Sequence, residues 1–321
     1  MKIRSSIPIL IAAILLSAAD CNAAPAPAVN LAVLPEDGAT QIIKIISEAS
    51  SGIDFVAHRF EEGPIADALA AAAARGVRVR VMLDKGSENG ADTNASVERR
   101  LKAAHVFTSW TNPKFISTMA RAIIADKSKA LVLTFDPVQE NFSGARGFAV
   151  LIRDPIDVSD LSWTYEADWS RVLVKRKQSS LAWEPDGAKA KLFDIIHGAT
   201  ASIDIYADDV KDPEIEESLA QAVKRGVIVR LLAGSSAVCS SAGLTRLTMD
   251  GVTVRCMPKL TLAARAIIAD DGRGSHLAML GISRLESKRS SQTRGLGVVV
   301  SDEKRLGRLR ETFLRDWNGA K

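Results

Sequence analysis

The sequence contains the same seven residues, Ala-Arg-Ala-Ile-Ile-Ala-Asp, at positions 120–126 and again at positions 264–270. Further segments recur around them in the same order, at an offset of about 150 residues, close to half of the chain. A repeat at this spacing indicates an internal duplication in which each copy folds into a similar unit. We therefore expect two related halves rather than one continuous architecture.

Each half alternates apolar strands with amphipathic helices. In the first half, β-rich segments are expected at 53–57 and 77–83, and apolar residues between them recur at helical spacing. The corresponding segments of the second half are 203–207 and 227–232. In both halves Arg-Gly-Val ends a helix and leads into a strand, with glycine at its usual C-terminal position. Strands that alternate with helices predict an α/β architecture.

The two repeats are assigned to residues 29–174 and 181–321. Each closes with a strand and then a helix that contains Asp-Trp, at Asp168 in the first repeat and Asp316 in the second. The boundary between them contains Lys-Arg-Lys at 175–177, followed by polar residues. Such a run is typical of a solvated linker, and a contact with nucleic acid or lipid is the alternative.

The beginning of the chain has the layout of a secretory signal peptide. A basic start precedes an apolar run at 7–19, and small residues follow it. This run is too short to span a bilayer comfortably as a helix. We expect cleavage near Ala23, so that residues 1–23 are the signal peptide and the mature protein is periplasmic or secreted. Lipidation of Cys21 is the alternative.

The composition is that of an ordinary globular protein, with 47% apolar and 25% charged residues. The net charge of +4 mildly favours anionic partners, although an ordinary surface explains it equally well. After the signal peptide no run is long enough to span a membrane. We expect the mature chain to be a monomer without a transmembrane span.

Two cysteines remain after the expected cleavage, Cys239 and Cys256. In an oxidising compartment two thiols within reach of each other tend to pair, so we expect a Cys239–Cys256 disulfide. Two separate buried thiols are the alternative. The four histidines are scattered, and none lies at ligand spacing from a cysteine, which argues against a metal site.

The two repeats together resemble the phospholipase D superfamily. The resemblance rests on the strand at 53–57, the alanine- and leucine-rich helix after it, and Arg-Gly-Val-Arg-Val at 75–79. It rests also on the repeated heptapeptide, on the closing Asp-Trp, and on the recurrence of these elements in the second half. It implies an α/β fold in which two phospholipase D-like repeats pack as a pseudo-twofold, bilobed unit.

Members of this superfamily carry the signature His-x-Lys-x-x-x-x-Asp once per repeat, and the resemblance implies the chemistry. One histidine attacks the phosphorus of a phosphodiester and forms a phosphohistidine. The other protonates the leaving group and then activates water or an alcohol. The lysines stabilise charge on the phosphoryl oxygens, the aspartates orient the imidazoles, and neither a metal nor another cofactor is needed.

Counting back from the final aspartate of each copy places arginine at the lysine position and an apolar residue at the histidine position. The three positions hold Met119, Arg121 and Asp126 in the first copy, and Ala263, Arg265 and Asp270 in the second. Arginine keeps the charge and binds phosphate as a fork, but methionine and alanine can neither attack phosphorus nor carry a proton. The resemblance therefore implies a ligand-binding frame of arginines and aspartates that has lost its usual mechanism. Internal pairing of the arginines with carboxylates is the alternative.

His58 is the candidate substitute for the lost histidines. It follows the strand at 53–57, and strand ends in such sheets tend to face the ligand crevice. Asp208 occupies the matching position in the second half, so a His58–Asp208 pair could act as base and orienter. The alternative for His58 is a rim histidine bonded to a neighbour.

Two functions follow from these patterns. The first is an exported, non-catalytic protein, a pseudoenzyme, that binds a phosphate-containing or other anionic ligand between the repeats. A phospholipid headgroup, a nucleic acid or a cell-envelope polymer would fit, with contact to a membrane surface or to nucleic acid. The second is a metal-independent, phospholipase D-like phosphodiesterase that works through His58. A purely structural or interaction domain is a weaker third interpretation.

Overall fold

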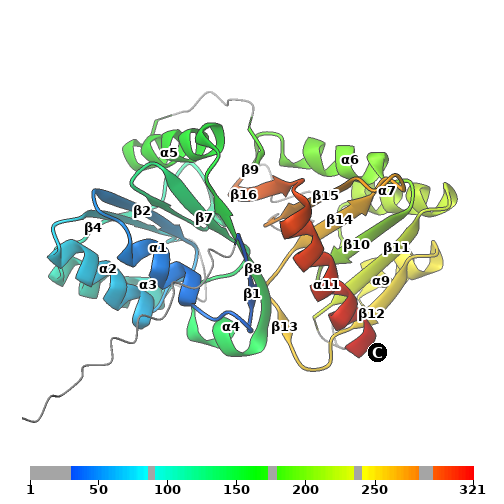
Figure 1. Cartoon of the computed structure of the whole chain (residues 1–321), viewed down its shortest axis with the longest axis horizontal. Coiled ribbons are helices and arrows are strands. Elements are labelled where there is room, and N and C mark those ends of the chain that lie inside the picture. The colour runs from blue at the N-terminus through cyan, green and yellow to red at the C-terminus, as the bar shows by residue number, and fades with distance from the viewer. Residues whose placement is uncertain (1–29, 86–90, 173–178, 235–240, 282–291) are drawn as a thin grey trace, which may run out of the picture.

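The structure is a computed structural model, and it describes residues 30–85, 91–172, 179–234, 241–281 and 292–321. The predicted signal peptide and the centre of the linker lie outside these residues. The described chain forms two α/β lobes (Figure 1). We name the part up to residue 172 lobe 1 and the part from residue 179 lobe 2.

Lobe 1 is built on a mixed sheet with the strand order β1–β8–β7–β6–β2–β3–β4. Strands β2, β3 and β4 are parallel to one another, and the remaining neighbours are antiparallel. Most of these strands are apolar and buried on both faces, as expected where other elements cover both sides of a sheet. The strands are β1 (Leu31–Leu34), β2 (Gly52–Ala57), β3 (Arg78–Leu83), β4 (Phe107–Trp110), β6 (Ala122–Ala125), β7 (Lys129–Leu133) and β8 (Ala145–Ile152).

The helices of lobe 1 lie on both sides of this sheet. The first three pack on its outer face, where Ile46, Leu69 and Leu101 join the core formed with Phe55. Helix α5 packs on the inner face through Tyr165 and neighbouring apolar residues. The helices are α1 (Thr40–Ser47), α2 (Pro64–Ala74), α3 (Ala91–Ala103), α4 (Gln139–Gly144) and α5 (Pro155–Ser170).

Lobe 2 repeats this arrangement with the strand order β12–β11–β10–β14–β15–β16, and β9 pairs with β16. The strands are β9 (Leu181–Glu184), β10 (Ser202–Tyr206), β11 (Ile228–Ala233), β12 (Thr253–Cys256), β14 (Ala266–Asp270), β15 (His276–Leu280) and β16 (Thr293–Val300). The helices are α6 (Ala188–Gly198), α7 (Pro213–Lys224), α9 (Ala242–Met249) and α11 (Glu303–Gly319). Helices α6, α7 and α9 cover the outer face of the sheet, and α11 covers the inner one.

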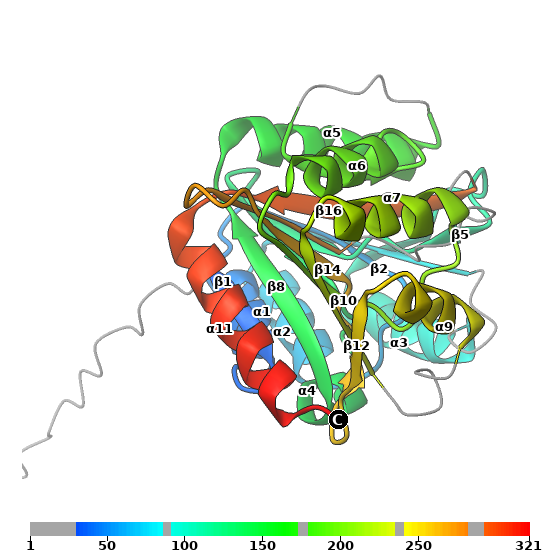
Figure 2. The ribbon, with the colours of Figure 1, turned by 90° about the vertical axis from the view of Figure 1, so that its right-hand side faces the viewer.

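The inner faces of the two sheets share one hydrophobic core. It contains Val56 and Ile124 from lobe 1 together with Tyr206 and Ile268 from lobe 2. The closing helices α5 and α11 pack into the same core, and Figure 2 shows α11 running alongside β8 of the other lobe. Because burial of shared apolar surface stabilises both partners, the two lobes form one packed unit.

Each lobe also contributes a short strand to the sheet of the other. Strand β5 (Ser117–Thr118) of lobe 1 pairs in parallel with the beginning of β16, at Thr293 and Arg294. Strand β13 (Thr261–Leu262) of lobe 2 pairs in parallel with the beginning of β8, at Ala145 and Arg146. This reciprocal exchange is what a pseudo-twofold arrangement requires.

The fold expected from the sequence is confirmed. The repeated heptapeptide forms equivalent strands, β6 and β14, in the two lobes. Gly76 and Gly226 follow α2 and α7 with the same positive φ of 88°, as expected for glycine after a helix. None of the helices in the described segments is long and apolar enough to cross a membrane.

Candidate functional site

A cavity of about 540 Å³ lies where the two lobes meet, and both lobes line it. Lobe 1 contributes the residue after β2, the approach to β6 and the segment from β7 to the end of α4. Lobe 2 contributes the segment around β13. The principal lining residues are His58, Arg59, Met119, Arg121, Asp136, Glu140, Asn141, Thr261, Ala263 and Arg265.

Arg121 precedes β6 and is nearly buried. Its Nε donates to the Asp136 carboxylate at 2.5 Å, and its Nη1 donates to the Met119 carbonyl at 2.9 Å. Burial acts to raise the pKa of Asp136, but the charge and hydrogen bond of Arg121 outweigh it, so this pKa lies below its ordinary value. Asp136 is therefore a carboxylate at neutral pH, and it fixes the orientation of the guanidinium.

Arg265 occupies the equivalent position before β14. Its Nη2 lies 3.6 Å from Oδ2 of Asp208, and its side chain is 23% exposed. The two arginines predicted from the repeated heptapeptide therefore line one cavity from opposite lobes. Each arginine reaches the cavity and also contacts a carboxylate, so internal pairing is confirmed and anion binding stays a prediction.

His58 lines the cavity and pairs with a residue that the sequence did not reveal. Its Nδ1 lies 2.9 Å from Oδ2 of Asp84, which follows β3. Asp84 also accepts hydrogen bonds from the hydroxyls of Thr111 and Ser117 and from the backbone N–H of Thr118. Burial acts to raise the pKa of Asp84, but the bond to His58 and these donors bring it below its ordinary value. An ionised Asp84 accepts a hydrogen bond from the Nδ1–H of His58, and in this tautomer of the neutral imidazole the lone pair is on Nε2.

The expected pairing of His58 with Asp208 is wrong. Adjacent parallel strands end at the same edge of a sheet, so β2 and β3 bring His58 and Asp84 together within lobe 1. Asp208, after β10, contacts Arg265 within lobe 2. The rule that drew attention to His58, a polar residue directly after an apolar strand, would also have found Asp84.

Asp126 and Asp270, the other predicted ligand-binding residues, do not line this cavity. Arg121 and Asp126 stand at opposite ends of β6, roughly 16 Å apart for five residues of extended chain. The Asp126 carboxylate accepts hydrogen bonds from the backbone N–H groups of Ser50, Ser51 and Gly52. These donors hold its pKa well below the ordinary value, although burial opposes them.

Asp270 is likewise engaged in local structure, in lobe 2. Its Oδ1 accepts from the backbone N–H of Gly272 at 2.7 Å, and its Oδ2 lies 3.3 Å from Nε2 of His276. Both aspartates therefore secure loops at the far ends of their strands, and the structure removes them as ligand-binding candidates.

Met119 and Ala263, which fill the positions where the resemblance implies histidine, both line the cavity. Neither side chain carries a group that can attack phosphorus or transfer a proton. Their backbone N–H groups donate across the lobe boundary, Met119 to the Arg294 carbonyl at 2.8 Å and Ala263 to the Arg146 carbonyl at 3.0 Å. The cavity thus retains the predicted cations and lacks histidines at these two positions.

A third cation, Arg59, follows His58 in the cavity wall. Its Nη1 lies 3.2 Å from Oε1 of Glu140. Its Nε is buried and has no hydrogen-bond partner among the described residues. A buried donor without a partner costs free energy, so an acceptor bound beside Arg59 would relieve that cost.

The described residues include no group of three or more His, Cys, Asp and Glu side chains arranged to hold a metal ion. Cys256, at the end of β12, is partly buried. Cys239 lies outside the described residues, so the Cys239–Cys256 disulfide stays a prediction.

Comparison with known proteins gave one family match and several structural ones. Residues 42–169 match a family model described as "Cardiolipin synthase, PLD-like domain". A comparison with curated proteins found no match. The chain is structurally similar to a polyphosphate kinase from Porphyromonas gingivalis, with a TM-score of 0.69 and 14% identity, over 89% of this chain and 50% of that protein. The chain thus spans half the length of that kinase.

A second similar structure is a phosphatidylserine synthase from Haemophilus influenzae Rd KW20, with a TM-score of 0.66 and 11% identity, over 91% of this chain and 87% of that one. A third is Nuc from Salmonella typhimurium, described as a phospholipase D family member, at 20% identity and a TM-score of 0.40, over 46% of this chain and 97% of that one. At these identities the similarity to the first two establishes the fold.

Proposed function

We propose that this chain is a member of the phospholipase D superfamily, since residues 42–169 match a PLD-like family model, and that it binds a phosphate-containing anion in the cavity between its lobes. The observation that carries the proposal is that Arg121 and Arg265, one from each lobe, line the same cavity. Arg59 adds a third guanidinium beside them. Guanidinium forks match the geometry of phosphate oxygens and bind them with charge-assisted hydrogen bonds.

The carboxylates of the cavity leave room for such a ligand. Within the described residues, Arg121 donates through Nε and Nη1, so Nη2 remains available to an anion. Asp136 therefore holds the arginine in place without occupying the whole fork. A phosphate group can bind without breaking this ion pair.

The source of the phosphate is the open part of the proposal. A phospholipid headgroup, a nucleic acid and an envelope polymer share the same phosphodiester chemistry. Polyphosphate kinase and phosphatidylserine synthase are named for phosphate-containing compounds, and both share the fold of this chain, which supports phosphate as the anion. A binding role without catalysis follows from Met119 and Ala263.

Titration calorimetry tests this proposal. We expect the wild-type protein to bind pyrophosphate, and Arg121→Ala or Arg265→Ala to weaken that binding about tenfold or more, because each removes a charge-assisted contact. Arg246→Ala is the matched control, since Arg246 pairs with Glu216 on the outer surface. Parallel titrations with a short-chain anionic phospholipid, oligonucleotide and teichoic acid-like polymer separate the sources. Binding that is absent, or unaffected by both cavity variants, would contradict the proposal.

A second candidate function, a metal-independent phosphodiesterase, is favoured by the His58–Asp84 pair. Asp84 orients the imidazole and leaves Nε2 free to take a proton from an attacking water. The arginines would then stabilise the charge that develops on the phosphoryl oxygens. In this route water forms the new P–O bond, the ester P–O bond breaks, and the proton held by His58 passes to the leaving oxygen.

Hydrolysis of bis(4-nitrophenyl) phosphate checks this candidate. If it is correct, His58→Gln should reduce kcat by about a hundredfold or more and Asp84→Asn by a smaller factor. His197→Gln is the control, because His197 stacks on Phe193 of the same helix, α6. Wild-type protein that shows no turnover, or turnover unchanged by His58→Gln, would exclude this route.

The cellular setting is also part of the proposal. The sequence of residues 1–23 supports export and removal of a signal peptide, which would place the mature protein in the periplasm or outside the cell. That setting would allow the Cys239–Cys256 disulfide to form. Intact mass measured with and without reduction, together with sedimentation of the mature chain, tests the cleavage near Ala23, the disulfide and the expected monomer.

A further inference from the structure

Arg146 and Arg294 occupy equivalent positions at the beginning of β8 and of β16, and both are buried. We propose that each is a positioning residue for the cavity segment of the opposite lobe, Arg146 for residues 263–265 and Arg294 for residues 119–121. The consequence for anion binding rests on the function proposed above. The positioning itself does not depend on that function.

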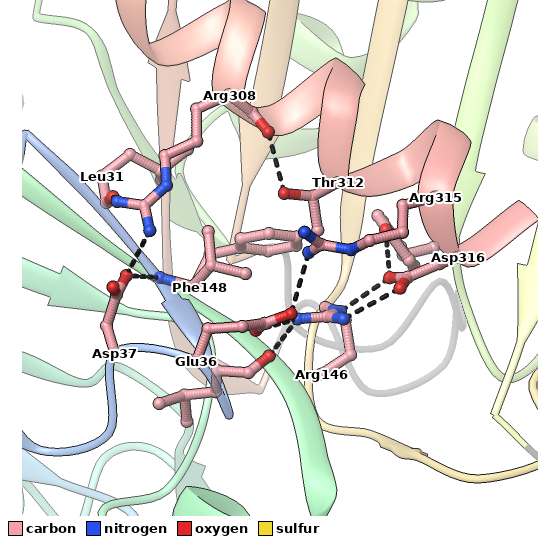
Figure 3. Close-up of polar contacts among 12 residues, drawn as sticks. Leu31, Glu36, Asp37, Arg146, Phe148, Arg308, Thr312, Arg315 and Asp316 are labelled. Atoms are coloured by element: carbon pink, nitrogen blue, oxygen red, sulfur yellow. Dashed lines mark hydrogen bonds and ion pairs between the residues drawn. The ribbon is translucent and has the colours of Figure 1, made fainter.

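Arg146 is tied to both lobes by charged contacts (Figure 3). Its Nε and Nη2 donate to the two carboxylate oxygens of Asp316 in α11 of lobe 2, at 2.6 and 2.8 Å. Its Nη1 donates to Glu36 of lobe 1 at 2.6 Å and to the carbonyl of Leu34. Tyr206 also donates to Asp316, so the acceptor is itself fixed. The guanidinium has little freedom to move.

Arg294 makes the equivalent set of contacts on the other side of the pseudo-twofold axis. Its Nη2 lies 3.1 Å from Oδ1 of Asp168, and its Nε lies 3.0 Å from Oδ2, so it bridges from lobe 2 to α5 of lobe 1. Its Nη1 reaches Asp186, in the turn after β9, at 3.2 Å. The Phe115 ring lies against the guanidinium, with its centroid 4.0 Å away. Each of the two arginines thus contacts a turn of its own lobe and the closing helix of the opposite lobe.

The backbone carbonyls of these two arginines hold the cavity segments. The Arg146 carbonyl accepts hydrogen bonds from the N–H groups of Ala263 and Ala264, at 3.0 and 2.8 Å. The Arg294 carbonyl accepts from those of Met119 and Ala120, at 2.8 and 3.0 Å. The next residue along each chain is the cavity arginine, Arg265 or Arg121. The backbone directly before each cavity arginine is therefore held by hydrogen bonds to the other lobe.

Anchoring of this kind should matter for binding. A flexible segment must lose conformational freedom before its arginine can hold a ligand, and a segment already fixed avoids that cost. Because the anchors cross between the lobes, correct packing of the two lobes and correct placement of the two cations are coupled. The anion site is then complete only when both anchors are formed.

Hydrogen–deuterium exchange resolves the crossed pattern directly. In Arg146→Met we expect amide exchange at Ala263 and Ala264 to become about tenfold faster or more, while exchange at Met119 and Ala120 stays unchanged. In Arg294→Met we expect the reverse. Each variant is thus the control for the other. A general loss of structure would loosen both segments in both variants, and that result, or no change in either, would overturn the proposal.

Arg308→Met supplies a second control. Arg308 also joins α11 of lobe 2 to lobe 1, through Asp37 at 2.7 Å and the Leu31 carbonyl, but it does not hold either cavity segment (Figure 3). It should lower the melting temperature without faster exchange at 119–120 or 263–264. If Arg146→Met does not fold, Asp316→Asn weakens the same anchor without changing side-chain volume. It should loosen 263–264 alone, and loosening of both segments would again contradict the proposal.

Pyrophosphate titration adds the functional half of the test. We expect Arg146→Met and Arg294→Met each to weaken binding about tenfold, and Arg308→Met to leave it within about twofold of wild type. If all three variants weakened pyrophosphate binding equally, the anchors would contribute only to the overall stability of the fold, and their positioning role would be refuted. If wild-type protein binds no pyrophosphate, the proposed function fails, while the exchange pattern still decides the positioning claim.

Discussion

At the scale of single residues, the cavity arginines illustrate how a buried cation is kept available for a ligand. A buried guanidinium without a partner would be costly, so Arg121 pairs with Asp136 and Arg265 contacts Asp208. The pairing also fixes where each fork points. In the proposed anion site, carboxylates that fix the arginines in advance would lower the conformational cost of binding.

Asp126 tests whether an aspartate outside the cavity contributes to folding stability and not to ligand binding. We expect Asp126→Asn to lower the free energy of unfolding at pH 7 by about 1–2 kcal/mol, because a carboxylate is a stronger acceptor than an amide for the three N–H groups it caps. Pyrophosphate affinity should not change, since Asp126 is remote from the cavity. Chemical denaturation and calorimetry measure both quantities.

The pH dependence of this contribution has a defined sign. The folded-state pKa of Asp126 lies below its ordinary value of 3.8, so the contribution is fully present above that value and is lost as pH falls through the folded pKa. The stability difference between wild type and Asp126→Asn should therefore shrink below pH 3.8. A difference that grows on acidification would contradict the lowered pKa of Asp126. A loss of pyrophosphate affinity in the variant would return Asp126 to the candidate site.

At the scale of elements, the two copies of the repeat have kept their strands and diverged at the strand ends. Asp84, directly after β3, pairs with His58, whereas the equivalent position after β11 is Gly234. A Cβ at Gly234 would lie 2.7 Å from the Leu262 Cβ and 2.9 Å from an Asp208 oxygen, so lobe 2 has no room for a carboxylate there. At these strand ends, lobe 1 thus has the His58–Asp84 pair and lobe 2 has the Arg265–Asp208 pair.

Helix ends are a second feature that the elements share. Gly226 follows α7 with φ of 88°, and the space around its Cβ position is open. We expect Gly226→Ala to destabilise the protein by about 1 kcal/mol through backbone conformation alone. Gly307→Ala, inside α11, is the matched substitution and should be neutral or stabilising. Thermal or chemical denaturation compares them, and equal effects would show that the positive φ does not matter.

At the scale of the whole molecule, duplication explains what the sequence could and could not predict. Strands β6 and β14, the glycine-terminated helices and the two-lobed α/β fold follow from repeated local patterns, and the structure confirms them. The sequence also predicts Arg121 and Arg265 as cavity residues, because both lie inside the repeated heptapeptide.

Other features depend on contacts that no local pattern reveals. Predicting the His58–Asp84 pair would require knowing that β2 and β3 are neighbours in the sheet. The anchor between Arg146 and Asp316 joins residues far apart in the chain. Asp316 stands in the repeated Asp-Trp, but that motif does not show which residue its carboxylate contacts. The signature places Asp126 among the ligand-binding residues, because it gives spacing along a strand but not which end of the strand meets the cavity.

The central claim is that two arginines, one from each lobe, hold one anion. A double-mutant cycle with Arg121→Ala, Arg265→Ala and the combined variant, measured by pyrophosphate calorimetry, tests it most directly. If both arginines contact the same ligand, the losses in binding free energy should be non-additive, with a coupling of about 0.5–3 kcal/mol. Strictly additive losses, or single variants that bind as tightly as wild type, would show that the cavity does not hold the anion between its lobes.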